Sequence, residues 1–112
     1  MRAEELKGHL DALLLAALEA GPRHGYAVIE HLRETSGGRL DLPTGTIYPA
    51  LHRLEQAGLI EGSWSVVGGR RRRSYALTGS GIRELAGRRA GWREFAEVVG
   101  GALEAKPWPS PA

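Results

Sequence analysis

Cysteine is absent from this 112-residue chain, which excludes disulfides, thiolate nucleophiles and cysteine-ligated zinc sites. The chain also lacks any run of about eighteen apolar residues, so no membrane-spanning helix is expected. Its N-terminus has no basic segment followed by a long apolar core, and a signal peptide is therefore not expected either. These absences, with the short length, predict one small protein of the reducing cytoplasm without a membrane partner.

Catalytic and metal-binding patterns are missing as well. The four histidines (His9, His24, His31 and His52) do not pair with a carboxylate at a ligand spacing on one helix face. No serine, histidine and acid form a recognisable nucleophilic set, and Gly68–Gly69 has the pattern of a turn, not of a phosphate-binding loop. The sequence predicts neither an enzyme nor a protein with a bound cofactor or metal.

Charge is distributed unevenly although the net charge is only +2. Residues 62–93 carry eight arginines against Glu84 alone, whereas residues 1–61 carry six basic and nine acidic side chains. A positive segment within a nearly neutral protein indicates a local anionic partner.

Residues 42–60, LPTGTIYPALHRLEQAGLI, are the centre of the predicted fold. Ile47, Leu51 and Leu54 recur at i, i+4 and i+7, which predicts a helix with one buried seam. Pro49 predicts an irregular or slightly kinked first turn, because it lacks an N–H and its ring clashes with a regular helix. The opposite face carries polar and uncharged or cationic groups, namely Gly45, Tyr48, Pro49, His52 and Gln56.

Two helices are expected before this one. Leucines and alanines from Leu6 to Leu18 form a helical stripe that ends before Gly21–Pro22, and a second helix is expected over His24–Ser36. Leu15 lies off the stripe and is predicted either to be exposed or to contact a partner subunit. After residue 60, extended segments at Ser63–Val67 and Arg72–Leu77 flank Gly68–Gly69, which predicts a β-hairpin.

A last helix is expected from residue 79 to about residue 105, followed by a proline-rich, disordered tail at 106–112. Leu85, Trp92 and Val99 repeat every seven residues, the spacing of a seam between helices, and Phe95 belongs to the same apolar stripe. The three-helix body is too small to cover this stripe, so a second subunit is expected to do so. The pair Gly100–Gly101 favours a kink or an end of the helix.

Three ordered motifs, HGYAVIEHL at 24–32, GTIYPALHRLEQAGLI at 45–60 and GGRRRRSYALT at 68–78, resemble the PadR family of transcriptional regulators. The short C-terminal segment is similar to the smaller PadR subfamily, in which one helix dimerises the protein. The resemblance implies a winged helix-turn-helix domain over residues 1–78 and a dimerisation helix over 79–105. The predicted fold class is thus mainly α with a small β-hairpin (α+β).

Double-stranded DNA is the expected partner. The arginine run is predicted to contact phosphates, the central helix to contact the groove, and the residues expected at the interface are Thr44, Thr46, Tyr48, Pro49, His52, Arg53, Arg70, Arg71, Arg72 and Arg73. The alternatives are a solvated hairpin for the arginines, a partly buried ring for Tyr48 and plain surface for His52. The residues predicted for dimerisation are Leu15, Leu85, Trp92, Phe95 and Val99.

Trp92 and Phe95 have two interpretations. They either fill the core of a dimer or form a site there for a small aromatic or apolar effector. The second interpretation follows from the resemblance, because multidrug-sensing PadR proteins use a tryptophan at the dimer centre to stack planar compounds. The sequence thus predicts a homodimeric repressor that binds a palindromic operator, with release by such an effector as a hypothesis. Two alternatives stay open: a winged-helix module that binds proteins, and a small-molecule-binding protein without an operator.

Overall fold

The computed structural model describes residues 1–108, and within them the chain forms helices around one core together with a small sheet. The elements in chain order are a 3₁₀ helix η1 (Ala3–Leu6), α1 (Leu10–Ala17), β1 (Arg23–His24), α2 (Gly25–Thr35), α3 (Thr44–Gln56), β2 (Ile60–Val67), β3 (Arg70–Leu77) and α4 (Gly79–Leu103). The predicted α+β class is confirmed. Within the described part of the chain, no helix is long and apolar enough to cross a membrane.

The first helix is shorter than the leucine stripe predicts. Gly8 takes a φ of 86°, a left-handed conformation that interrupts the helix between η1 and α1. The expectation for Leu15 was also wrong, because its side chain is fully buried within the single chain. α1 contacts α2, α3 and α4, so residues on more than one of its faces are covered.

The sheet holds one strand more than the sequence predicts. The strand order is β1-β3-β2, with both pairs antiparallel, and the two residues of β1 pair with Tyr75 and Ser74 of β3. His24 is therefore a strand residue that also caps α2, and not part of that helix. The predicted hairpin is confirmed, with Gly68 and Gly69 at φ values of 58° and 77° in the two-residue turn that joins β2 to β3.

The core lies where α1, α2 and α3 meet the base of the hairpin. The predicted α3 seam is confirmed, because Ile47, Leu51 and Leu54 are all buried. α3 runs unbroken from Thr44 to Gln56 through Pro49, so the expected irregularity of its first turn does not interrupt the helix.

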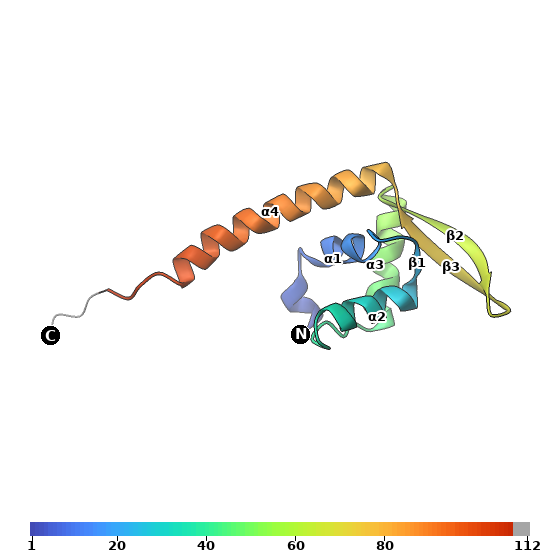
Figure 1. The fold of residues 1–112 in the computed structure, drawn as a ribbon, viewed down its shortest axis with the longest axis horizontal. Helices are drawn as coiled ribbons and strands as arrows, with labels where there is room; N and C mark the ends of the chain where they lie inside the picture. The colour runs from blue at the N-terminus through green and yellow to red at the C-terminus, as the bar shows by residue number, and fades with distance from the viewer. Residues whose placement is uncertain (109–112) are drawn as a thin grey trace.

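α4 begins at Gly79, where the Thr78 hydroxyl accepts a hydrogen bond from the Gly81 N–H over 3.1 Å. It then runs as one helix to Leu103, past the predicted break at Gly100–Gly101. Figure 1 shows α4 passing α1 and extending beyond the body, on the side opposite the β2–β3 hairpin. Residues 105–108 have no regular secondary structure, and the last four residues of the predicted tail lie outside the described part of the chain.

Candidate nucleic-acid interface

The ring of Tyr48, a residue of α3, packs against Gly25 at the start of α2. A Cβ on Gly25 would lie 2.5 Å from Cε1 of the Tyr48 ring, closer than any side chain allows, so α2 and α3 approach through this contact. The ring is nevertheless 42% exposed. The ring is thus partly buried against α2, as one interpretation of Tyr48 predicted, and contact with the DNA groove stays a prediction.

The remaining α3 candidates lie on the outer side of the helix. Thr44, Pro49 and His52 are exposed, and Thr46 is half-buried. Glu55 is the only acidic residue in α3, and its carboxylate binds the hairpin. The solvent-facing side of α3 therefore offers hydroxyl, aromatic, imidazole and amide groups with no free carboxylate, which suits contact with a polyanion.

Arg53 is exposed on α3, yet it is engaged with α1. Its Nη2 donates to Oδ1 of Asp11 over 2.7 Å, while Oδ2 of the same carboxylate lies 3.9 Å from Nη2 of Arg88 in α4. Asp11 thus joins the candidate recognition helix to α4. An Arg53 that contacts a phosphate must first leave this ion pair or share it.

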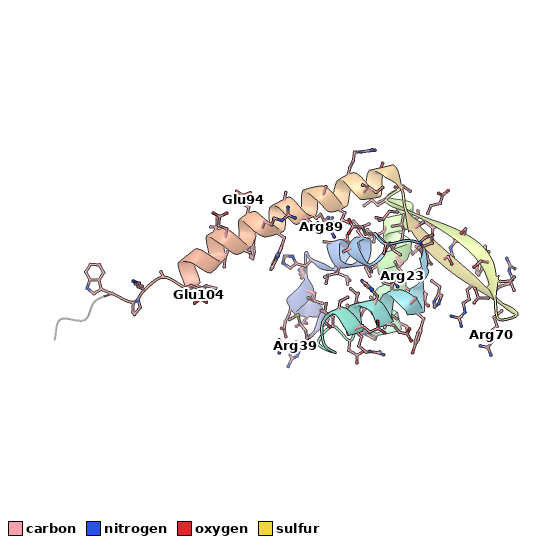
Figure 2. The ribbon with its side chains drawn as sticks, in the orientation of Figure 1. Arg23, Arg39, Arg70, Arg89, Glu94 and Glu104 are labelled. Atoms are coloured by element: carbon pink, nitrogen blue, oxygen red, sulfur yellow. The ribbon has the colours of Figure 1, made fainter. Side chains whose placement is uncertain are left out.

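The four arginines at 70–73 are not equivalent in the structure. Arg70 and Arg71 are exposed near the turn, and Figure 2 shows Arg70 at the tip of the hairpin, projecting away from the body. The guanidinium of Arg71 lies 4.8 Å from the centroid of the Trp64 ring, a cation–π contact on one face of the hairpin. These two cations are the ones that the fold leaves available to an anion.

Arg72 and Arg73 bind the protein itself. Nη1 of Arg72 lies 3.1 Å from Nε2 of His24, and Arg73 donates to the carboxylate of Glu55. Both side chains are half-buried. Alternation along β3 places Arg71 and Arg73 on one face and Arg70 and Arg72 on the other.

His24 is a residue whose role sequence reasoning missed. Its Nδ1 accepts a hydrogen bond from the Ala27 N–H over 3.2 Å and so caps α2, while Nε2 faces Arg72. A neutral imidazole has one acceptor nitrogen, so His24 can satisfy one of these two donors at a time. No clear signal for this role is present in the sequence, because histidine is not among the residues preferred at an N-cap.

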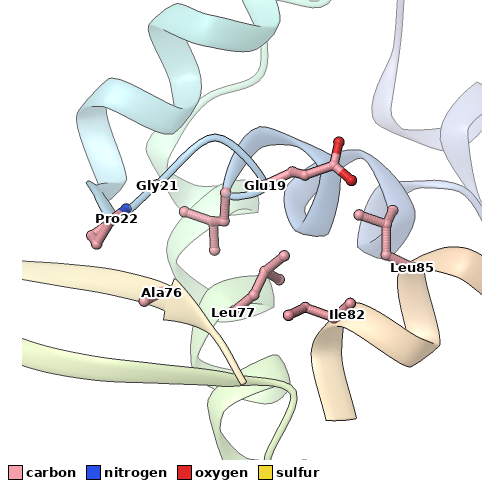
Figure 3. A pocket seen from close by; sticks show the side chains of 8 residues that line it. Glu19, Gly21, Pro22, Ala76, Leu77, Ile82 and Leu85 are labelled. Atoms are coloured by element: carbon pink, nitrogen blue, oxygen red, sulfur yellow. The ribbon is translucent and has the colours of Figure 1, made fainter. Parts of the chain in front are cut away.

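The base of the hairpin contains buried residues. Tyr75 is 7% exposed, and burial raises the pKa of its phenol. A pocket of about 320 Å³ lies between the α1–β1 connection, the end of β3 and the start of α4, and Figure 3 shows its mainly apolar lining, which includes Leu77 and Ile82. None of the predicted DNA-contacting residues lines this pocket.

The residues predicted for dimerisation fall into two groups. Leu85 is 2% exposed and packs in the core of the single chain, so its assignment to a subunit seam was wrong, as was that of Leu15. Trp92 and Phe95 are 54% and 52% exposed, and their rings stack with centroids 6.0 Å apart. The His9 ring meets the Trp92 ring edge-on at 5.4 Å, and Val99 is half-buried one turn further along α4.

Comparison with known proteins shows which protein family this chain resembles. The family model described as "Transcriptional regulator PadR-like family" matches residues 14–87, more than half of the chain. The transcriptional regulator Rv3488 of Mycobacterium tuberculosis is 41% identical over 80 residues, which are 70% of this chain and 62% of that protein. That relative is named as a transcriptional regulator and not as an enzyme.

Solved structures agree with the family model. A PadR family transcriptional regulator from Eggerthella lenta superposes with a TM-score of 0.80 at 32% identity, covering 92% of this chain and 88% of that one. One from Clostridium difficile gives a TM-score of 0.76 at 33% identity over 86% of this chain and 99% of that one. The winged-helix fold, the arginine-bearing hairpin and these matches together show that the chain belongs to the PadR-like family of transcriptional regulators.

Proposed function

We propose that this protein is a homodimeric repressor that binds a palindromic operator through α3 and the β2–β3 hairpin (residues 60–77, the wing). The carrying observation is electrostatic. The exposed Arg70 and Arg71 extend from the body beside an outer α3 surface that has no free carboxylate. Phosphates supply most of the affinity of such an interface, and the neutral polar groups of α3 supply selectivity.

The distal half of α4 (residues 90–103) supports a dimer. Trp92, Phe95, Val98 and Leu103 are more than half exposed on a helix that leaves the body. Large apolar side chains gathered on one exposed element favour burial against a partner. A second copy of the same helix is the simplest partner, since most soluble oligomers are symmetric homo-oligomers. A two-fold axis would then present two α3 helices to half-sites about one turn of DNA apart.

The stacked pair of Trp92 and Phe95 supports effector binding at the same place. A planar aromatic or apolar compound that inserts between the rings of two subunits would change how the α4 helices pack, and with them the spacing of the two α3 helices. The effector mechanism depends on the dimer, because one copy of these rings leaves the site open to water.

The test uses charge reversal at the tip of the wing. Arg70→Glu with Arg71→Glu should weaken binding of a random-sequence duplex by about a hundred-fold at low salt. It should also lower the slope of log K against log salt by about 3.6, because a dimer loses two phosphate contacts per subunit at about 0.9 per contact. Arg2→Glu with Arg83→Glu is the matched control, because it makes the same charge change at exposed arginines outside the wing. Fluorescence anisotropy of labelled DNA measures both quantities.

Equal losses in the two variants would overturn the interface. Wild-type protein that binds no duplex at any salt would instead favour a protein-binding module. Selection of bound sequences from a random pool then tests the operator, with two inverted half-sites about ten base pairs apart as the expected result. A reporter whose promoter carries the selected site should be expressed less when the protein is present, whereas increased expression would identify an activator.

A further inference from the structure

We propose that Glu55 and Arg73 are positioning residues that fix the angle between the wing and α3, and that Arg73 does not contact phosphate. The proposal rests on the proposed DNA-binding function, which it sharpens. It assigns two roles within the arginine run. Arg70 and Arg71 at the tip contact DNA, whereas Arg73 at the base stabilises the position of the wing.

One carboxylate oxygen joins α3 to both strands of the wing. Oε2 of Glu55 accepts a hydrogen bond from the Gly62 N–H in β2 over 3.1 Å and another from Nη2 of Arg73 in β3 over 2.5 Å. Glu55 stands one residue before the last residue of α3, so the contact connects the end of that helix to the base of the hairpin. We call Glu55, Gly62 and Arg73 the wing lock.

The Arg73 guanidinium occupies the space that a side chain at position 62 would need. A Cβ on Gly62 would lie 2.7 Å from Cζ, Nε and Nη2 of Arg73. The guanidinium therefore crosses β2 at its glycine on the way to Glu55. This arrangement needs three residue types at once, an acid near the end of α3, a glycine in β2 and an arginine in β3.

The aromatic neighbours confine Arg73 further. Its guanidinium lies 5.5 Å from the centroid of the Trp64 ring and 5.9 Å from that of the Tyr75 ring. The side chains of Arg73 and Glu55 are 33% and 25% exposed. A cation held by a carboxylate and bordered by two rings is not free to reach a phosphate, whereas Arg71 on the same face is exposed.

Geometry explains why such a lock would matter for DNA binding. From Gly62 to the turn, β2 runs for five residues, or about 17 Å at roughly 3.3 Å per residue. A rotation of about 10° at the base would therefore move Arg70 and Arg71 by about 3 Å, the length of a hydrogen bond. Two arginines that must meet phosphates in one register with α3 need this angle to be fixed before DNA arrives.

The first experiment needs no DNA. Glu55→Gln removes the charge but keeps a side chain of the same shape, and it should speed amide hydrogen exchange across residues 62–67 at least about ten-fold, the effect of losing a hydrogen bond to a charged group. Exchange in α1 and α2 should stay unchanged, which shows that the variant is folded. Arg73→Gln should have the same effect, and the double variant should show less than the sum of the two changes.

The second experiment measures DNA affinity against salt with the same random-sequence duplex. Glu55→Gln and Arg73→Gln should each weaken binding about ten-fold and leave the salt slope of wild type unchanged, because no phosphate contact is lost. Arg71→Gln is the comparison, and its slope should fall by about 1.8, because the dimer loses one phosphate contact per subunit.

Two results would overturn the proposal. One is wing exchange that Glu55→Gln does not change, and the other is a salt slope that Arg73→Gln lowers as Arg71→Gln does. If wild type binds no duplex at all, the proposed function fails, while the exchange experiment still decides whether the lock exists.

Discussion

The two halves of α4 have the same secondary structure but opposite surroundings. In the proximal half (residues 79–89), Gly81 and Leu85 are buried, and Arg89 pairs with Glu19 beyond the end of α1. In the distal half, the large side chains from Trp92 onward are mostly exposed. The first half contributes Leu85 to the core of its own chain, and the second half presents apolar surface to the outside.

Glycines mark the same division. A Cβ on Gly81 would lie 2.0 Å from the carbonyl oxygen of Leu59, so this glycine allows α4 to touch the α3–β2 connection. Within the described part of the chain, no atom beyond the adjoining residues and the nearby helix backbone lies within 4 Å of the position of a Cβ on Gly91, Gly100 or Gly101 in the distal half, or on Gly87 at the end of the proximal half. Gly81 is explained by the monomer, whereas the glycines from Gly91 onward open the surface of a helix that we propose to meet a second copy.

The largest expected effect comes from filling the proximal contact. Gly81→Ala should lower the free energy of unfolding by about 3 kcal/mol, because the new methyl group meets a backbone carbonyl that cannot rotate away. Urea unfolding followed by circular dichroism, at one fixed protein concentration, measures this change.

Gly91→Ala is the matched control in the distal half. It should stabilise the chain by up to about 1 kcal/mol, the difference in helix propensity between alanine and glycine. Similar destabilisation by both substitutions would contradict the division of α4, and would indicate that Gly91 is packed closely in the protein in solution.

A smaller effect is expected from a charge in the distal half. Phe95→Glu should raise the dissociation constant of the dimer about 30-fold, equivalent to about 2 kcal/mol, because the carboxylate would be buried without a partner. Light scattering over a range of concentrations measures the dissociation. Glu94→Gln is the control, because Glu94 lies on the side of α4 away from the body (Figure 2), and it should leave the dimer intact.

If the dimer dissociation constant is unchanged in Phe95→Glu, the distal half of α4 does not form the dimer interface. The monomer itself should remain folded in this variant, since Phe95 is already half exposed in the single chain. The urea midpoint at low concentration, where wild type is also dissociated, separates loss of association from loss of folding.

Local patterns predicted the elements of this fold well. Ile47, Leu51 and Leu54 are buried as their spacing requires, and the hairpin turns at Gly68–Gly69 because both residues need a positive φ. These features depend on neighbours in the sequence. The pattern of residue types along the chain is therefore enough to predict which face of α3 is apolar and where the chain turns from one strand to the next.

Features that depend on distant partners were not predicted. Leu15 lies off the α1 stripe but is buried, because α1 is packed between other helices on several sides. Arg73 is part of a cationic run in sequence but binds Glu55 in space, and Arg53 likewise binds Asp11. Periodicity identifies a charged side chain, but only the tertiary fold decides whether that charge faces a partner or its own protein.

The smallest expected effect concerns the exposed ion pair that holds the proximal half of α4 beside α1. Arg89 donates to both carboxylate oxygens of Glu19, over 2.6 and 2.8 Å, and this pairing lowers the pKa of Glu19. A carboxylate with a lowered pKa in the folded state stabilises the protein above its ordinary pKa of about 4.3, and this contribution is lost as pH falls through the folded value.

The stability difference between wild type and Glu19→Gln should therefore be small and constant at neutral pH, and should vanish as the pH falls below about 4.3 towards the folded pKa. Added salt should reduce the difference at neutral pH, because the pair is exposed and screened. Urea unfolding of both proteins from pH 7 to pH 3 measures it. A difference that persists at pH 3 would mean that Glu19 supports α4 through packing of its stem and not through its charge, and the proximal half would then be attached to the body mainly by Leu85 and Gly81.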